Sequence, residues 1–121
     1  MAKIILVDDH KDIVDTLKMI VQKEGHTTAE AYNGQDFINK IEKEKPDLAI
    51  LDVMMPGLTT REILTEIKKL GLQNTKIILV TVVRFSEREI KSMMADFNIV
   101  DYIQKPFDLT DLIARLRKAL A

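Results

Sequence analysis

The sequence predicts an α/β fold in which a parallel β-sheet is covered by helices on both faces. Three short runs are almost wholly apolar, which is typical of strands buried on both sides: Ile4–Val7, Asp47–Leu51 and Ile77–Val80. Longer amphipathic segments separate these runs, and such alternation favours parallel strands joined by crossover helices. Because the crossovers are right-handed, the helices change sides where the winding direction reverses. We therefore expect a doubly wound sheet in a single domain, residues 1–121.

Two weaker strands are expected near Thr27–Tyr32 and Ile99–Ile103. The first two helices are each bounded by a stop signal. Gly25 is expected to cap the first helix, and the second ends before Lys45-Pro46, because a residue that precedes proline resists α-helical geometry. Their apolar faces are expected to consist of Ile13, Leu17, Ile20 and Val21 in the first helix and of Phe37, Ile38 and Ile41 in the second.

The last three helices are predicted from apolar stripes and from capping residues. Gly71 follows the third helix, Ser86–Glu89 resembles a capping box that opens the fourth, and Asp108 is a suitable N-cap for the fifth. Their inward faces are expected to be Ile63, Leu64, Ile67 and Leu70, then Ile90, Met93, Met94 and Phe97, and finally Leu109, Leu112, Ile113, Leu116 and Leu120. The order of the strands in the sheet cannot be read from these patterns.

Composition limits the possible functions. The chain has 18 basic and 19 acidic residues and a net charge of −1, so no overall field favours nucleic acid or an anionic membrane. It lacks cysteine, which excludes disulfides, thiolate zinc sites and cysteine nucleophiles, and a reducing cytoplasm is compatible with that composition. The apolar run at the N-terminus is too short for a signal peptide or a membrane span. We expect a cytoplasmic protein.

Polar residues follow four of the expected strands. Asp8 and Asp9 follow the first, Asp52 the third, Thr81 the fourth and Lys105 the fifth, and ligands of open α/β sheets bind at these carboxyl ends. Two carboxylates ~4 Å apart repel by roughly 4 kcal/mol at an effective dielectric of about 20, so one lysine cannot balance three. The remaining charge of about −2 calls for a divalent cation, and oxygen ligands favour Mg²⁺ or Mn²⁺ over zinc. Such a pocket is suited to phosphoryl chemistry.

In sequence and spacing, these segments resemble the receiver domains of two-component response regulators, and the resemblance covers essentially the whole chain. The matching segments are Val7-Asp8-Asp9, Leu51-Asp52-Val53-Met54-Met55-Pro56-Gly57, Thr81, and Tyr102-Ile103-Gln104-Lys105-Pro106-Phe107. Each segment is a weak signal alone, but all of them in order are specific. The resemblance implies a flavodoxin-like sheet with strand order 2-1-3-4-5, the order known for a chemotaxis receiver.

The resemblance also implies a role for each acidic residue. Asp52 corresponds to the nucleophile that takes a phosphoryl group from a phosphohistidine and becomes an acyl phosphate. Asp8 and Asp9 correspond to the Mg²⁺ site, with Asp9 as a direct ligand and Asp8 acting partly through water. Met54 is expected to offer only its backbone carbonyl to the metal.

Three further residues match the phosphoryl-binding and switch positions of the family. Lys105 is expected to pair with a phosphoryl oxygen, and its peptide bond to Pro106 to be cis. Thr81 is expected to bond another phosphoryl oxygen and so to report phosphorylation. Tyr102 matches the switch aromatic, which turns inward as Thr81 moves.

Purely structural explanations of these residues remain open. Asp8 and Asp9 are favoured as helix caps, Asp52 precedes a turn, Thr81 and Tyr102 are common strand residues, and Lys105 would be unremarkable on a surface. We expect His10 to be a solvated loop residue because hard metals prefer oxygen ligands. The methionines are expected to fill gaps in the core or at its rim: Met19, Met54, Met55, Met93 and Met94.

The sequence departs from the family pattern at three places. Thr60 stands where many receivers have glycine, which predicts an altered loop after Asp52 or less tolerance for positive φ. Val82 follows Thr81 where a small residue is usual, and we expect it to narrow access to Asp52. The segment Asn98–Val100 replaces a common Gly-Ala-Asp and leaves the geometry before Tyr102 uncertain.

The main functional hypothesis is a receiver that is switched by a sensor histidine kinase or a histidine phosphotransfer protein. Its output surface would be the fourth helix, fifth strand and fifth helix, including Lys91, Tyr102 and Arg115, and would bind a downstream protein or domain. We expect no direct contact with nucleic acid or membrane, and either a monomer or a phosphorylation-linked dimer. Alternatively, the chain is the receiver of a DNA-binding regulator, because Asp101 and Arg115 match charged positions of dimerising regulators.

Hypotheses from other classes fit less well. A haloacid-dehalogenase-type phosphatase needs a second acid two residues after its nucleophile, where this chain has Met54. Neither GxxxxGK[ST] nor GxGxxG occurs, so nucleotide enzymes are disfavoured. A flavin site would need a phosphate-binding loop after the first strand, where Asp8-Asp9 has the wrong charge.

Overall fold

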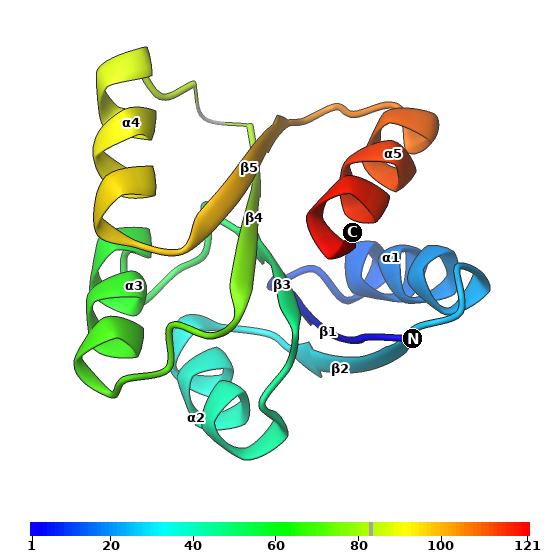
Figure 1. Ribbon diagram of the computed structural model, residues 1–121, viewed down its shortest axis with the longest axis horizontal. Helices are drawn as coiled ribbons and strands as arrows, with labels where there is room; N and C mark the ends of the chain where they lie inside the picture. Colours follow the sequence, from blue (N-terminus) through cyan, green and yellow to red (C-terminus); the bar gives the residue numbers. More distant parts are fainter. Residues whose placement is uncertain (83) are drawn as a thin grey trace.

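The computed structural model describes residues 1–82 and 84–121. Within these residues, five parallel strands form one sheet in the order β2-β1-β3-β4-β5 (Figure 1). The strands are β1 (Lys3–Val7), β2 (Thr27–Ala31), β3 (Leu48–Asp52), β4 (Lys76–Thr81) and β5 (Ile99–Gln104). The doubly wound parallel sheet and the strand order implied by the family resemblance are both confirmed.

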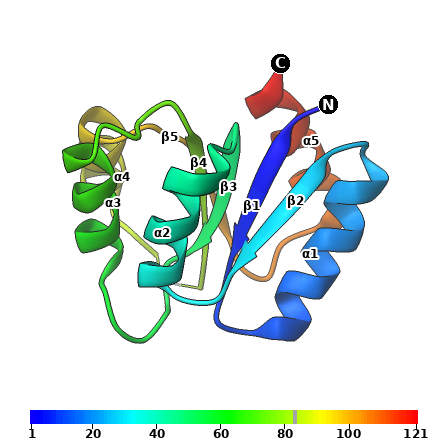
Figure 2. The same cartoon turned by 90° about the horizontal axis from the view of Figure 1, so that it is seen from below.

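Helices cover both faces of this sheet. They are α1 (Lys11–Lys23), α2 (Gly34–Glu44), α3 (Thr60–Lys69), α4 (Glu87–Asp96) and α5 (Leu109–Leu120). Helices α1 and α5 lie on one face, and α2, α3 and α4 lie on the other (Figures 1 and 2). In the part of the chain that the structure describes, none of the helices is long and apolar enough to cross a membrane.

The alternation of side chains along β3 explains why its sequence is apolar at consecutive positions. Leu48 and Ile50 pack in a core with α1 and α5, whereas Ala49 and Leu51 pack in a core with α2, α3 and α4. All four residues are at most 1% exposed. A central strand of a sheet covered on both faces has no solvent side, so both of its faces are apolar.

Several expectations about the helix faces were wrong. Leu70, Met94 and Leu109 are 44%, 38% and 49% exposed, and Met19 is 73% exposed. Leu70 lies just beyond the last turn of α3 and Leu109 is the first residue of α5, so both lie at helix ends. Met94 lies next to the buried Met93, about 100° further around the helix. Val14, which the apolar stripe omitted, is fully buried in α1.

Most of the expected helix boundaries are confirmed. The capping box of Ser86 and Glu89 opens α4, and Asp108 caps α5 by accepting a hydrogen bond from the Thr110 amide at 3.1 Å. Helix α2 ends before Lys45, which takes a left-handed conformation with φ 47°. Gly25 follows the end of α1 with φ 93°.

One strand boundary differs from the expectation. Strand β3 begins at Leu48, not at Asp47. The Asp47 carboxylate accepts a hydrogen bond from the Lys3 backbone N–H at 2.9 Å, while its own N–H donates to the Lys3 carbonyl at 2.8 Å. Asp47 therefore holds the start of β1 through two hydrogen bonds to Lys3, although Asp47 itself lies just before β3.

The segment before β5 is irregular, as its sequence suggested. The register between β4 and β5 shifts there, since Ile77 pairs with Ile99 but Ile78 pairs with Asp101. The extra residue is Val100, which is 39% exposed. The Asn98 side-chain amide donates to the carbonyls of Gln73 at 2.8 Å and of Thr75 at 3.1 Å and so holds the start of the strand.

Candidate metal and phosphoacceptor site

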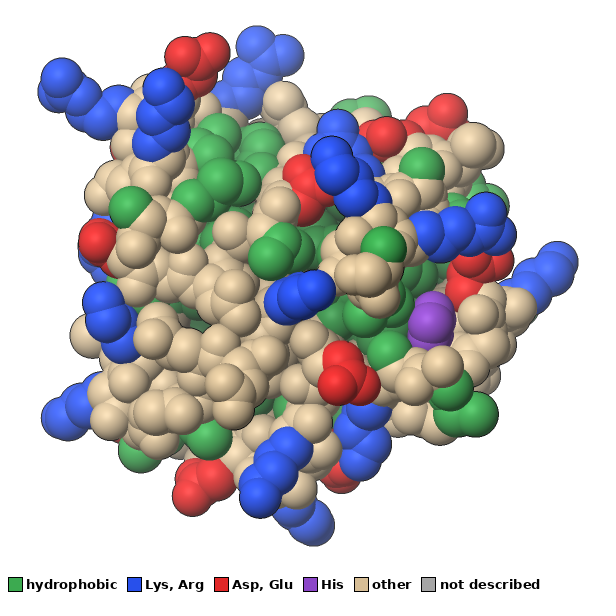
Figure 3. Space-filling view, viewed as in Figure 1, with side chains coloured by type: hydrophobic (Ala, Val, Ile, Leu, Met, Phe, Trp, Pro, Cys, Tyr) green, Lys and Arg blue, Asp and Glu red, His purple; other side chains and the backbone are tan. Residues whose placement is uncertain are grey.

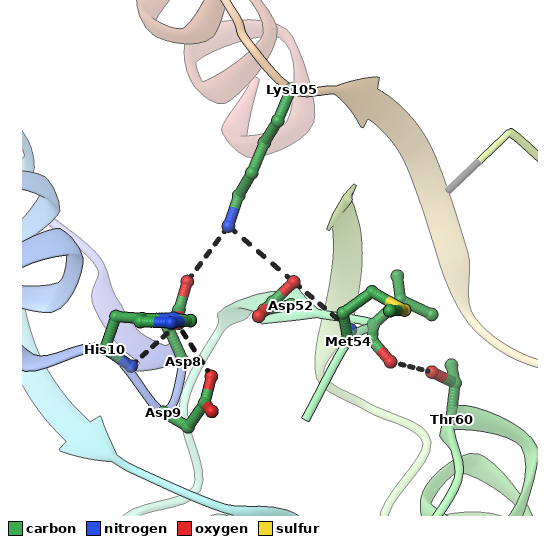
Figure 4. Close-up of polar contacts among 8 residues, drawn as sticks. Asp8, Asp9, His10, Asp52, Met54, Thr60 and Lys105 are labelled. Atoms are coloured by element: carbon green, nitrogen blue, oxygen red, sulfur yellow. Dashed lines mark hydrogen bonds and ion pairs between the residues drawn. The ribbon is translucent and has the colours of Figure 1, made fainter. Parts of the chain in front are cut away.

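The carboxyl ends of β1 and β3 bring together three acids. The two strands are neighbours, with Val7 aligned to Leu51, so the next residues, Asp8 and Asp52, emerge side by side. They are only 2% and 5% exposed. One ligand atom from each of Asp8, Asp9, His10 and Asp52 lies within 4.8 Å of the others (Figure 4). The acidic cluster expected from the sequence is therefore formed.

Lys105 reaches this cluster from just beyond β5. Its Nζ donates a hydrogen bond to Oδ2 of Asp8 at 3.1 Å and lies 3.7 Å from Oδ1 of Asp52 (Figure 4). The Lys105 backbone N–H donates to the Thr81 carbonyl at 2.8 Å, which ties the lysine to the end of β4. The Lys105–Pro106 peptide bond is cis, as expected. Because only 16% of its side chain is exposed, Lys105 is not an ordinary surface lysine.

The two buried carboxyl groups differ in their ease of ionisation. Burial raises the pKa of Asp52, and the negative charge of Asp8 adds to this effect, although the Met54 amide opposes it. For Asp8, burial acts in the same direction, but hydrogen bonds from His10 and Lys105 outweigh it and lower the pKa. The protein's own groups therefore do not fully compensate the charge of ionised Asp52.

Asp9 supplies an oxygen that the protein itself does not satisfy. Its Oδ1 is buried and accepts no hydrogen bond from residues 1–82 or 84–121. The Nδ1 atom of His10 lies 3.1 Å away, but outside hydrogen-bonding geometry. Such an orphaned oxygen normally has a partner, such as an ion. Together with the oxygens of Asp8 and Asp52 it forms a donor set that fits a hard divalent cation.

Comparison with known proteins agrees with this geometry. Residues 4–117 match the family model of the response regulator receiver domain. The chain belongs to this family. A CheY-like receiver domain protein from Methanospirillum hungatei is 31% identical with a TM-score of 0.86, and the match covers 99% of this chain and 94% of that one.

Two further solved structures are similar to this receiver domain. TrrA from Thermotoga maritima, solved in complex with Mg²⁺-BeF, is 32% identical with a TM-score of 0.80, over 98% of this chain and 99% of TrrA. NtrX from Brucella abortus, solved in complex with ATP, is 30% identical with a TM-score of 0.81. That match covers 98% of the receiver domain but 27% of the NtrX chain.

The remaining predicted site residues lie at or near the same edge of the sheet. Thr81 is fully buried and follows Val80, which is aligned with Asp52. The backbone N–H of Met54 donates to Oδ1 of Asp52 at 3.3 Å, so Met54 adjoins the acceptor. The metal-binding role of its carbonyl stays a prediction, as does the phosphoryl-binding role of Thr81.

Tyr102 is half-buried on β5, next to the segment that leads into α4. Its ring packs edge-on against Phe85, with centroids 5.9 Å apart and planes at 67°. Arg115 of α5 donates to the Tyr102 carbonyl at 3.3 Å and to Asp101 at 2.7 Å. Tyr102, the predicted switch residue, therefore contacts Phe85, which precedes α4, and Arg115 of α5. A tyrosine with a purely structural role would pack in the same way.

His10 is the exposed loop residue that was expected, but it also contacts the acidic cluster, which was not predicted from the sequence. Its ring is 64% exposed, but Nδ1 lies 3.0 Å from Oδ1 of Asp8 and 3.1 Å from Oδ1 of Asp9. The hydrogen bond to Asp8 raises the pKa of His10, and the charges of Asp9 and Asp8 add to this effect. Its position directly after two consecutive aspartates was the signal that could have identified it.

The structural alternatives for the acids are only partly realised. The N-cap of α1 is His10, and neither Asp8 nor Asp9 occupies that position. Asp8 instead accepts a hydrogen bond from the His10 backbone N–H at 2.9 Å. Asp52 does accept a turn hydrogen bond, from Met54, so its turn role coexists with its place in the cluster.

The departures at Thr60 and Val82 leave the site residues in place. Thr60 is the first residue of α3, and its hydroxyl donates to the Val53 carbonyl at 3.3 Å. Among the residues that the structure describes, Lys45 is the one non-glycine residue with positive φ, so Thr60 needs no glycine-like geometry. Val82 is 59% exposed beside the site.

Proposed function

We propose that this receiver domain accepts a phosphoryl group on Asp52 from a phosphohistidine, with Mg²⁺ or Mn²⁺ bound by neighbouring oxygens. The donor would be a sensor histidine kinase or a histidine phosphotransfer protein. The observation that carries the proposal is the gathering of Asp8, Asp9 and Asp52 within 4.8 Å, with Lys105 at the same point.

The chemistry requires one bond exchange at phosphorus. A carboxylate oxygen of Asp52 attacks the phosphorus atom, so that a P–O bond forms and the P–N bond breaks. The donor imidazole keeps the proton on its other ring nitrogen and leaves as a neutral group. Lys105 then pairs with a phosphoryl oxygen, for which its ammonium is already positioned near Asp52. The hydroxyl of Thr81 bonds another oxygen.

The metal would be held by Asp8, Asp9, Asp52 and the Met54 carbonyl. When bound, it would supply positive charge that offsets the carboxylates and the phosphoryl oxygens. The buried Oδ1 of Asp9, which accepts no hydrogen bond from the residues that the structure describes, supports this assignment most directly. Mg²⁺ is the first choice because the proposed ligands are all oxygens.

The domain is a regulatory phosphoacceptor and not an enzyme that processes a separate substrate. We propose that it assists its own phosphorylation and loses the phosphoryl group slowly by hydrolysis. Residues 1–121 would form one receiver domain that works in the cytoplasm.

The output would be a change of the surface formed by α4, β5 and α5, including Lys91, Tyr102 and Arg115. Tyr102 supports this choice, since its ring contacts Phe85 before α4 and its carbonyl accepts from Arg115 of α5. A downstream protein or domain would read this surface. The much longer NtrX chain, of which this receiver matches 27%, is a precedent for a receiver within a larger protein, so a DNA-binding regulator remains the second candidate.

The surface charge does not favour direct contact with nucleic acid or membrane. Basic and acidic side chains are interspersed on the face shown in Figure 3. The net charge of −1 agrees with this distribution. The domain would act as a monomer or as a phosphorylation-linked dimer.

Intact-mass analysis tests the proposal. The protein is incubated with acetyl phosphate and Mg²⁺, beside Asp52→Ala and beside a sample with EDTA. We expect the mass of one phosphoryl group to be added to the wild type and not to Asp52→Ala. In the wild-type sample that contains EDTA, we expect no such addition. An equal gain in Asp52→Ala would show that Asp52 is not the acceptor.

A further inference from the structure

His10 contacts the oxygens that the metal would need. Its Nδ1 lies 3.0 Å from Oδ1 of Asp8 and 3.1 Å from Oδ1 of Asp9. In Figure 4 the imidazole lies against these two aspartates, on the same cluster that Lys105 reaches. The Asp9 oxygen that accepts no hydrogen bond within residues 1–82 and 84–121 therefore has the histidine ring as its close neighbour.

Nδ1 of His10 must carry a hydrogen atom in this arrangement. Ionised carboxylates only accept hydrogen bonds, so a bare ring nitrogen would face two acceptors and gain nothing. The Nδ1–H group donates to Asp8 and points positive charge at the oxygens. Oδ1 of Asp8 already accepts from the His10 backbone, and Oδ2 accepts from Lys105. A carboxylate has about four acceptor sites, so few remain free on Asp8.

We propose that the His10 side chain is a displaceable cover over the metal-binding oxygens. This inference rests on the metal site of the proposed function. In the metal-free protein the ring partly neutralises Asp8 and Asp9, and it must move away before a divalent cation can bind both of them. His10 therefore stabilises the metal-free state and weakens the affinity for Mg²⁺.

The ring is free to leave without damage to the fold. It is 64% exposed, and α1 makes no use of it, since the His10 side chain forms no cap hydrogen bond. The backbone N–H of His10 keeps its own 2.9 Å hydrogen bond to Asp8 when the side chain turns. Only side-chain torsions have to change, and such motions are fast in exposed residues.

A ligand role for His10 makes the opposite prediction. If the imidazole bound the cation directly, removing it would weaken metal binding, most clearly for Mn²⁺, which accepts nitrogen more readily than Mg²⁺ does. The direction of the change in affinity therefore separates a cover from a ligand.

Calorimetric titration with Mg²⁺ and with Mn²⁺ at one fixed pH tests the proposal. It compares the wild type with His10→Ala, His10→Phe, which keeps an aromatic ring without the N–H, and Lys11→Ala. We expect both His10 variants to bind Mg²⁺ about three- to tenfold more tightly. Lys11 is the exposed next residue, so Lys11→Ala controls for the loss of a nearby positive charge and should change affinity less than about twofold.

Two further measurements are made on the same proteins. Without metal, both His10 variants should melt about 3–5 °C below the wild type, because Asp8 loses the hydrogen bond from the His10 ring and Asp9 loses a neighbouring positive group. The chain has 2 histidines, so in NMR spectra the ring signals of His10 should shift on addition of Mg²⁺ while those of His26 stay in place.

The outcomes separate this inference from the proposed function. If the wild type binds Mg²⁺ and both His10 variants bind it equally well or more weakly, the proposal that His10 is a cover is wrong, while the metal site itself stands. If Lys11→Ala increased the affinity for Mg²⁺ as much as His10→Ala, the increase would be due to the loss of any nearby positive charge. That result would also overturn the proposal that His10 is a cover. No Mg²⁺ binding by any of the proteins would refute the metal site itself, and this inference with it.

Discussion

The ammonium of Lys105 lies 3.1 Å from Oδ2 of Asp8, a residue 97 positions away in the chain. This contact connects the end of β1 to the segment after β5, at opposite ends of the sequence. Both side chains are largely buried, at 16% and 3% exposure, so water screens their attraction only weakly. Lys105 is also 3.7 Å from Asp52, and a single ammonium therefore serves two buried carboxylates.

Removing Lys105 should destabilise the metal-free protein. Lys105→Met leaves Asp8 and Asp52 without their cation, and we expect a loss of about 2–4 kcal/mol in the free energy of unfolding. In a double-mutant cycle with Asp8→Asn, the coupling should be about 1–3 kcal/mol. Urea unfolding in EDTA measures both values.

The pair of Lys3 and Glu44 provides a matched control for this cycle. Their 2.8 Å contact is shorter than that of Lys105 and Asp8, but their side chains are 40% and 32% exposed. Lys3→Met should cost less than about 1 kcal/mol. A loss in Lys105→Met that does not exceed the loss in Lys3→Met would contradict the role given to burial.

Neutralising Asp52 should stabilise the metal-free protein. Carboxylates within 4.8 Å repel by roughly 3–4 kcal/mol at an effective dielectric of about 20, and Lys105 offsets part of this. We therefore expect Asp52→Asn to raise the free energy of unfolding by about 1–2 kcal/mol at neutral pH, measured by urea unfolding in EDTA. Asparagine keeps an oxygen that can accept from Met54.

The advantage of Asp52→Asn should depend on pH. Because the pKa of Asp52 is raised in the folded protein, ionised Asp52 is destabilising above that pKa. As the pH falls through the raised pKa toward 3.8, the ordinary value for aspartate, wild-type Asp52 takes up a proton and the difference between the proteins shrinks. If the difference in the free energy of unfolding between Asp52→Asn and the wild type grew as the pH fell, it would contradict a raised pKa of Asp52.

Val82 should slow chemistry at Asp52. It is 59% exposed and lines a hollow together with Lys105 and Pro106. Val82→Ala should open access to Asp52 for water and for the phosphoryl donor. We therefore expect phosphorylation by acetyl phosphate and decay of the acyl phosphate both to become about two- to tenfold faster. This corresponds to a barrier lower by roughly 0.4–1.4 kcal/mol. Equal decay rates for the two phosphorylated proteins would remove the effect.

Gly34 is required by close packing between α2 and α3. A Cβ atom at this position would lie 2.7 Å from Cδ1 and 2.9 Å from Cγ1 of Ile63. Helix propensity favours alanine, but we expect Gly34→Ala to cost about 1–3 kcal/mol because the buried Ile63 side chain would have to shift to make room for the methyl group. Thermal unfolding should show partial recovery when Ile63→Val is added. Gln35→Ala, at the exposed next residue, should stay within about 0.5 kcal/mol of the wild type.

The sheet could be predicted because its strands are buried on both faces. Runs such as Ile77–Val80 have no solvent side and are therefore apolar throughout. Helix faces were harder to predict at their ends, since periodicity cannot tell where a helix passes beyond the sheet, as Leu109 shows. The strand order came from the family resemblance, because no pattern in the runs encodes which strands are neighbours.

The acidic cluster could be predicted from position alone. Asp8 and Lys105 each follow a strand and Asp52 ends one, and parallel strands end at one edge. The contacts of His10 could not be read in the same way, because they depend on the side-chain torsion that turns Nδ1 toward the two carboxylates. The buried oxygen of Asp9 is likewise a property of packing, which the sequence does not express.

Chemical mapping of the phosphorylated residue tests the central claim most directly. Borohydride reduces an acyl phosphate of aspartate to homoserine, which peptide mass spectrometry locates in the chain. After treatment with acetyl phosphate and Mg²⁺, we predict homoserine at position 52 and unchanged aspartate at positions 8 and 9, with no conversion in EDTA. Homoserine at position 8 or 9, or a phosphoryl group that stays on Thr81 after reduction, would contradict the account.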